Sequence, residues 1–445
     1  MRHRIGGVKE IETTSPPSDD QNVKQPETPS FLKVLGPGLI AGASDDDPSG
    51  IATYSQAGAQ FGYGIGWTML FSWPLMCAIQ EISARIGRVT GYGIAGNLKR
   101  HYPRPLLLAM VTLLFIANTI NLGADLGAMA AALNLVIGGP QLAYVAMFGA
   151  VSVLLEIFVR YSRYVSVLKY LTLALFTYVG VAFVSPIPWG SVIYSLIVPR
   201  VEFTPAYLTM IVAILGTTIS PYLFFWQAEE EVEDVKERRG AKPLDRAPDQ
   251  AKSEFKRIRL DTYVGMALSN AVALFIIVTC AATLNVHGIT DIETSSQAAQ
   301  ALRPIAGEAA FVVFALGIVG TGLLAVPVLA GSAAYAVGEA AGWHVGLSRT
   351  LRRAKAFYLV IVLATVVGAV LNFMPIDPIK ALFWTAVMNG VVAVPVMTMM
   401  MLMTSKKAVM GEFTLPPILK FVGWAATVTM GIAVLGMAMT IGQPS

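Results

Sequence analysis

Residues 43–54, ASDDDPSGIATY, place three consecutive aspartates before Pro-Ser-Gly inside a segment that is otherwise apolar. VLGPGLIAGAS (34–44) precedes the aspartates, and IATYSQAGAQFGYGIGW (51–67) follows them. A carboxylate at membrane depth is costly and usually faces a cavity or another polar group. Because proline removes a backbone donor and glycine loosens the chain, we predict a break in a membrane helix here. Such a break is tolerated only where it lines a cavity or is covered by protein.

The composition is typical of a multi-spanning membrane protein. Of 445 residues, 55% are hydrophobic and only 13% are charged, and the mean hydropathy is +0.62. The net charge of +4 is small and its basic residues lie in particular loops, so we expect no nucleic-acid partner. Cys77 and Cys280 lie far apart in apolar segments and predict no disulfide framework.

The first 30 residues differ from the rest of the chain. Residues 1–30 are rich in Pro, Ser, Thr and charge and contain no apolar run, so they predict a disordered cytoplasmic tail and no signal peptide. Residues 31–441 are predicted to form one transmembrane domain. It contains eleven segments of membrane-spanning length, near 33–58, 62–86, 105–136, 140–159, 163–184, 205–228, 259–285, 305–340, 356–374, 378–403 and 417–441.

The distribution of Lys and Arg among the loops supports this count. Basic residues concentrate in the tail and in alternate loops, near 88–104, 160–163, 236–259, 349–355 and 406–407. The other loops contain few, among them Arg200, Arg303 and Lys380. By the positive-inside rule we expect a multi-pass protein of the cell membrane, with a cytoplasmic N-terminus and an extracytoplasmic C-terminus.

A second predicted break lies five spans after the first. In YLTMIVAILGTTISPYLFFWQ (207–227), residues 216–221 form the weakest helical stretch. Broken helices at matching positions of two halves point to the central site of a transporter. Asp47, backbone carbonyls, and the hydroxyls of Thr217, Thr218 and Ser220 would supply oxygen ligands there. Such ligands suit hard cations such as Mg²⁺, Mn²⁺ and Ca²⁺.

The three aspartates are expected to have different roles. Asp47, beside Pro48, is the predicted ligand. Asp45 and Asp46 either face an aqueous vestibule or pair with a basic group, and Asp46 is also a candidate to contact the ion through water. An amino-acid carrier would instead need amide donors in the break, and a row of aspartates would repel its substrate carboxylate.

At these residues the chain resembles the NRAMP family of divalent metal transporters, over about residues 31–441. The motifs LGPGLIA, DPSGIAT, FGYGIGW, QEISARIG, SPYL and MGEF follow in the family's order. The resemblance implies an all-α membrane protein of LeuT-like fold with eleven transmembrane helices, of which helices one and six are broken. It implies inverted five-helix repeats at about 31–184 and 205–403, and one extra helix at about 417–441.

The chain departs from the family pattern at the residues that bind metal. Asp47-Pro48-Ser49-Gly50 replaces Asp-Pro-Gly-Asn, so the acid is kept and the Asn amide is lost. Ser220-Pro221-Tyr222 replaces Met-Pro-His, with Thr217 at the position of a carbonyl-donating Ala. Asn121 and Ala124 stand near the positions of the family's acidic proton-path residues, and Asp125 is one position off.

These departures resemble a magnesium-transporting branch of the family. The resemblance therefore implies metal ligands at Asp47, Ser49, Gly50, Thr217 and Ser220. It implies import of Mg²⁺, and also of Mn²⁺, because a thioether ligand is lost. It implies weak or no proton coupling, because the family's acidic proton-path residues are lost. His3, His101, His287 and His344 all lie in the tail, in loops or at span ends, where none would relay protons at mid-membrane.

Two alternatives remain open. A proton-coupled Mn²⁺/Fe²⁺ importer would use Asp125 as the missing acid, and an organic-cation or amino-acid carrier would ignore divalent ions. We expect no enzymatic activity and no cofactor, and a monomeric transport unit in the lipid bilayer.

Further polar residues are candidates for the ion path. Asn118, Asn121 and Asp125 either line the path or bond neighbouring helices. Thr218, Tyr222 and Asn389 complete this set. Glu81 and Arg85, four residues apart, predict a structural pair. The acidic residues at 229–234 predict a solvated helix end or an inner vestibule, and the methionines at 397–403 predict packing.

Overall fold

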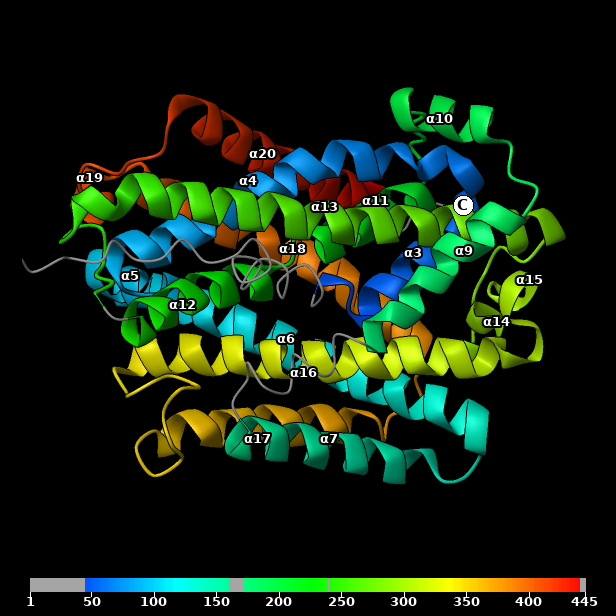
Figure 1. The fold of residues 1–445 in the computed structure, drawn as a ribbon, viewed down its shortest axis with the longest axis horizontal. Helices are drawn as coiled ribbons and strands as arrows, with labels where there is room; N and C mark the ends of the chain where they lie inside the picture. The colour runs from blue at the N-terminus through cyan, green and yellow to red at the C-terminus, as the bar shows by residue number, and fades with distance from the viewer. Residues whose placement is uncertain (1–44, 160–170, 239, 441–445) are drawn as a thin grey trace, which may run out of the picture. The chain divides into compact units, whose positions relative to one another are not determined.

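The computed structural model describes residues 45–159, 171–238 and 240–440. The predicted tail and the first part of span one, residues 33–44, lie outside these ranges. The described residues form helices, turns and loops, with no strand. The long helices are α4 (Trp67–Thr90), α6 (Arg104–Ile137), α7 (Gln141–Phe158), α13 (Ala251–Thr283), α16 (Ala310–Ala341), α17 (Lys355–Leu371), α18 (Pro378–Thr404) and α20 (Pro417–Thr440) (Figure 1).

Shorter elements connect the long helices or form parts of broken spans. They are α3 (Pro48–Phe61), η1 (Gly62–Ile65), α5 (Ile94–His101), η2 (Leu171–Leu175), α9 (Phe176–Val184), α10 (Trp189–Ile197), α11 (Pro205–Thr218), α12 (Pro221–Glu237), η3 (Pro248–Gln250), η4 (Asn285–His287), α14 (Ser295–Gln300), α15 (Arg303–Ala306), η5 (Gly307–Ala309) and α19 (Lys407–Met410). Seven helices of the described residues are long and apolar enough to cross a membrane, or eight if a pair bent by 117° at Leu173–Ile197 is one span. The membrane character is therefore confirmed, and the count of eleven stays a prediction.

Helices five spans apart in the predicted order pack against each other. α6 packs on α16, α7 on α17, and α4 on α13. The half-helices exchange partners instead, since α12 of span six packs on α4 of span two while α3 of span one packs on α13 of span seven. This exchange of partners is the arrangement expected for two repeats related by a pseudo-twofold axis.

Small residues let helices approach closely near the second break. A methyl group at Gly216 would overlap the Ala386 carbonyl, and one at Gly390 would lie 2.7 Å from the Val212 carbonyl. Such small-residue contacts are the usual way for membrane helices to pack tightly. They hold α11 against α18. The methionines of α18 pack in the same region, since Met397, Met400, Met401 and Met403 are buried.

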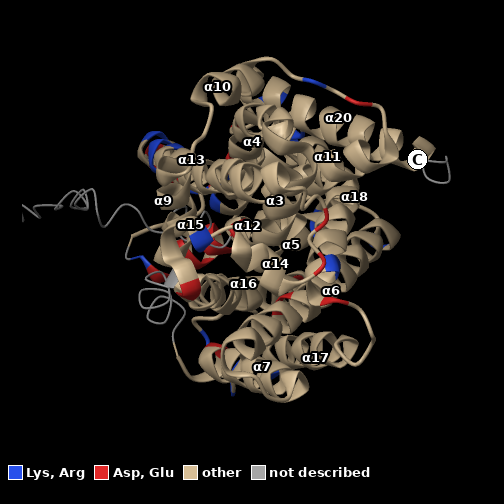
Figure 2. Cartoon of the chain, turned by 90° about the vertical axis from the view of Figure 1, so that its right-hand side faces the viewer, with Lys and Arg blue, Asp and Glu red and all other residues tan. Residues whose placement is uncertain are grey.

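The basic residues are distributed unevenly between the two ends of the helices. α5, α12 and α19 lie at one end in Figure 1, and α14 and α15 lie at the other. Figure 2 looks onto the end with α14 and α15, where little of the ribbon is coloured as Lys or Arg. Lys99 and Arg100 of α5 and Lys407 of α19 belong to the opposite end. The basic residues of α5 and α19 therefore lie at the same end, which the positive-inside rule predicts to be cytoplasmic.

Candidate functional site

The first break lies at Asp46 and Asp47, outside helical conformation, and α3 begins at Pro48. Asp47 caps this helix: its Oδ1 accepts hydrogen bonds from Ser49 Oγ at 2.6 Å and from the Gly50 amide at 2.7 Å. Proline suits the first helical position because its missing N–H would have no partner there. Local sequence therefore orients the Asp47 carboxylate at the start of the half-helix.

The second break consists of Ile219 and Ser220, between α11 and α12. Ser220 Oγ donates to the carbonyls of Gly216 (2.8 Å) and Thr217 (2.9 Å), and Thr218 Oγ1 donates to Ile214 (2.9 Å). These hydroxyls satisfy carbonyls that the end of a helix leaves free. Because these hydroxyls donate their protons to carbonyls, their oxygens keep lone pairs that a cation could use.

The two breaks meet at Asp47. Tyr222, in the first turn of α12, donates a hydrogen bond to Asp47 Oδ2 at 3.2 Å, and Asn121 of α6 donates to the same oxygen at 3.5 Å. A methyl group at Gly50 would lie 3.2 Å from Thr217 Oγ1. The structure thus brings together, as buried residues, the predicted set Asp47, Ser49, Gly50, Asn121, Thr217, Ser220 and Tyr222.

Asp45 and Asp46 have a different environment from both alternatives that we expected. Ser269 Oγ of α13 lies 2.6 Å from Asp45 Oδ2 and 3.1 Å from Asp46 Oδ1. Both aspartates are buried, at 0% and 5% exposure, and no described basic group forms an ion pair with them. Packing against α13 excludes the aqueous vestibule from these carboxyl groups. Sequence reasoning did not identify Ser269, since a single serine in an apolar helix is no distinctive signal.

Several buried oxygens around the break lack hydrogen-bond partners among the described residues. They are Asp45 Oδ1, Asn121 Oδ1, and both oxygens of Asp125, which lies one turn after Asn121 on α6. Buried acceptors left without a donor are costly, and a cation or its water shell would satisfy them. These unpaired carboxyl and amide oxygens are therefore suited to a hard cation. Among described residues no three His, Cys, Asp or Glu side chains could hold a metal together.

Asn118 and Asn389, two other predicted residues of the ion path, differ in their hydrogen bonds. Asn118 Nδ2 donates to the Leu329 carbonyl (3.0 Å) and to Ser332 Oγ (2.8 Å), so in this conformation it bonds α6 to α16. Asn389 is buried on α18, and its Nδ2 has no hydrogen-bond partner in the described part of the chain. The predicted pair of Glu81 and Arg85 is confirmed, with Oε1 and Nη2 2.7 Å apart.

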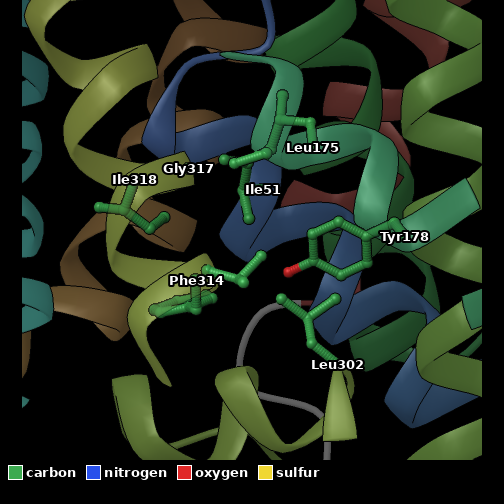
Figure 3. A pocket seen from close by; sticks show the side chains of 9 residues that line it. Ile51, Leu175, Tyr178, Leu302, Phe314, Gly317 and Ile318 are labelled. Carbon is green, nitrogen blue, oxygen red and sulfur yellow. The ribbon is translucent and has the colours of Figure 1, made fainter. Parts of the chain in front are cut away.

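A narrow apolar pocket lies beside the start of α3 (Figure 3). Ile51, Leu175, Leu302 and Phe314 line it, and the Tyr178 hydroxyl points into it. A cation would find no charged ligand there. The apolar side chains close this side of α3.

Larger cavities lie toward both ends of the helices. One cavity, of about 590 Å³, is lined by α3, α11, α18 and the loop at 290–292, and we call it the outer cavity because it lies at the end predicted to be extracytoplasmic. Beside it, Lys380 Nζ lies 2.8 Å from Glu293 Oε1, and this hydrogen bond holds the pKa of Glu293 below its usual range. The other cavity, of about 500 Å³, is lined by α5, α12, α16 and the loop that follows α16, and we call it the inner cavity because it lies at the end predicted to be cytoplasmic.

This chain is similar in sequence and in fold to known transporters. A divalent metal cation transporter, MntH, of Klebsiella pneumoniae is 25% identical over 405 residues, which cover 88% of this chain and 91% of that protein. The structure of a manganese transporter of Eremococcus coleocola superposes with a TM-score of 0.74 at 19% identity, covering 96% and 93% of the two chains. MhsT, solved in complex with L-phenylalanine, has a TM-score of 0.59 at 14% identity, covering 92% and 98%.

The similarities to the two solved structures concern the fold, and they confirm the LeuT-like architecture. Residues 38–441 also match the family profile described as "Nramp: Natural resistance-associated macrophage protein-like". The chain therefore belongs to the Nramp family.

Proposed function

We propose that this chain imports divalent metal cations, with Mg²⁺ and Mn²⁺ as substrates and with weak or no proton coupling. As a member of a family of transporters, it is a transporter rather than an enzyme. The observation that carries the proposal is the Asp47 carboxylate, held between two helix breaks and surrounded by hydroxyl, amide and carbonyl groups.

The choice of ion follows from the ligands. Ser220 stands where the family motif has methionine, so the site offers oxygen where a thioether would favour softer metals. Mg²⁺ gives up its water reluctantly and binds well through one or two carboxylates with several waters kept. Gly50 and Ser220 are smaller than the Asn and Met of the family motif, so they take up less of the space around the ion.

The driving force need not come from protons. Moving a divalent cation inward releases about 4.6 kcal/mol per 100 mV, twice the value for a single charge. With the basic loops on the cytoplasmic side, the outer cavity faces the entering ion and the inner cavity faces the cytoplasm. The transport unit is a monomer in the cell membrane.

One observation favours a second candidate, a proton-coupled Mn²⁺/Fe²⁺ importer. Asp125 is buried beside Asn121 and its carboxyl oxygens have no hydrogen-bond partner in the described residues, so it is a candidate proton carrier. Uptake of Mg²⁺, Mn²⁺, Ca²⁺ and Cd²⁺ into proteoliposomes, recorded together with internal pH, separates the two. Mg²⁺ uptake at constant internal pH supports the first candidate. Uptake of Mn²⁺ without Mg²⁺, accompanied by acidification, supports the second.

A further inference from the structure

The acidic residues of α12 differ in their partners. Glu231 lies 2.5 Å from Arg257, Asp234 lies 3.0 Å from Arg88, and Glu233 lies 3.3 Å from Lys236. Glu229 forms no ion pair with a described residue, although it is only 2% exposed. Its neighbour is another acid, Glu339 of α16, since a Cβ atom at Gly93 would contact the carboxyl groups of both residues.

Glu339 is fixed by the start of α5. Its Oε1 accepts a hydrogen bond from the Gly93 amide at 2.8 Å, and its Oε2 accepts one from the Gly96 amide at 2.7 Å. The absence of side chains on these glycines makes room for both acids. A methyl group at Gly93 would overlap the Glu229 carboxyl group and lie 2.7 Å from Glu339 Oε2.

Two carboxyl groups in contact cannot both be ionised without a large cost, so they share one proton. We propose that Glu229 and Glu339 form a proton-binding site that holds α12, the inner half of broken helix six, against α16 and α5. The pair is separate from the ion site at Asp47. It goes beyond the proposed function because it concerns the conformation of the inner end, whichever ion is carried.

A proton fits this site better than a metal ion. Both oxygens of Glu339 already accept backbone N–H groups, which leaves few lone pairs for a metal. Lys99 Nζ lies 3.4 Å from the Glu339 carbonyl, and the other cationic side chains of the cavity are Arg100, Lys236 and Arg349, with His344 beside them. Two further acids lie nearby: Glu233, which is paired with Lys236, and Glu230, which follows Glu229 on α12. The positive side chains that line the inner cavity oppose binding of a further cation.

The direction of the pH effect follows from the shared proton. With the proton bound, the carboxyl pair attracts and α12 stays in the position seen here. As the pH rises through the titration of the pair, two carboxylates face each other and repel. The contact is then weakened and the inner cavity opens.

Thiol labelling of the full-length protein tests this without any divalent ion present. Val232 lies on α12, lines the inner cavity and is 4% exposed, so Val232→Cys reports on separation of α12. The rate at which a maleimide labels Val232→Cys is divided by the rate for Glu237→Cys, an exposed position at the end of α12. This ratio removes the intrinsic effect of pH on the reactivity of thiols. The unsubstituted protein, with Cys77 and Cys280 buried, gives the background.

We expect the normalised labelling to rise several-fold from acidic to alkaline pH. Glu229→Gln should abolish this rise, because an amide donates to Glu339 without titrating, and Glu339→Gln should abolish it as well. The matched control Glu230→Gln, which changes the adjacent acid, should retain it. A flat pH profile with the native pair, or an unchanged rise in both Gln variants, would overturn the proposal.

Discussion

The phenolic oxygen of Tyr222 lies 3.2 Å from Asp47 Oδ2 and connects the start of one half-helix to the start of the other. Each residue follows or precedes a proline at a helix break, and 175 positions of sequence separate them. The hydrogen bond orients the carboxylate that we assign to the ion.

Removing that bond should weaken ion binding without removing the ligand. A net hydrogen bond contributes about 0.5–1.5 kcal/mol, so Tyr222→Phe should raise the KM for the transported ion about twofold to tenfold. Concentration-dependent uptake into proteoliposomes measures this. Tyr178→Phe is the matched control, since the Tyr178 hydroxyl lies in the apolar pocket without a hydrogen-bond partner among the described residues. Equal KM values for the two variants would refute the role of Tyr222.

Restoring a soft ligand should change the preference among ions. Ser220→Met places a thioether at the second break, so uptake of Cd²⁺ and Mn²⁺ should rise relative to Mg²⁺. The ratio of the uptake rates under competition is the quantity to measure. An unchanged ratio would mean that residue 220 does not contact the ion.

Close packing at the second break predicts a structural effect. In Gly216→Ala the new methyl group would overlap the Ala386 carbonyl, and overpacking of this kind costs about 1–3 kcal/mol. The thermal midpoint of the detergent-solubilised protein should fall. Gly190→Ala is the control, because no atom lies within 4 Å of a methyl group there. A midpoint that falls equally in both variants would contradict the packing argument.

Ser269 should stabilise the folded protein through its hydrogen bonds to Asp45 and Asp46. Ser269→Ala removes the donor shared by Asp45 and Asp46, and a buried acceptor without its donor costs about 1–3 kcal/mol. We expect a lower free energy of unfolding, measured against the partly exposed control Ser195→Ala, whose hydroxyl bonds only the Ser191 carbonyl of its own helix among the described residues. If the two variants were equally stable, the hydrogen bonds of Ser269 would contribute nothing.

The sequence predicts the breaks well because each depends on neighbouring residues. Asp47-Pro48 contains both the first break and the carboxylate that caps α3, and Ser220-Pro221 contains the second break. The partners of the buried side chains depend on distant helices instead. Ser269 and Asp45 are 224 positions apart, and Asn118 contacts Ser332 across 214 positions. A polar residue on an apolar helix does not indicate which neighbour it will face.

The central claim is that Asp47 binds the transported ion, and its most direct test is uptake by Asp47→Asn, which keeps the size of the side chain and removes its charge. Asp291→Asn, at the wall of the outer cavity, is the control for loss of a carboxylate elsewhere on the proposed route of entry. Mg²⁺ uptake into proteoliposomes should be abolished in Asp47→Asn and retained in Asp291→Asn, at equal amounts of reconstituted protein. Uptake that persists in Asp47→Asn at the rate of the unsubstituted protein would contradict the account.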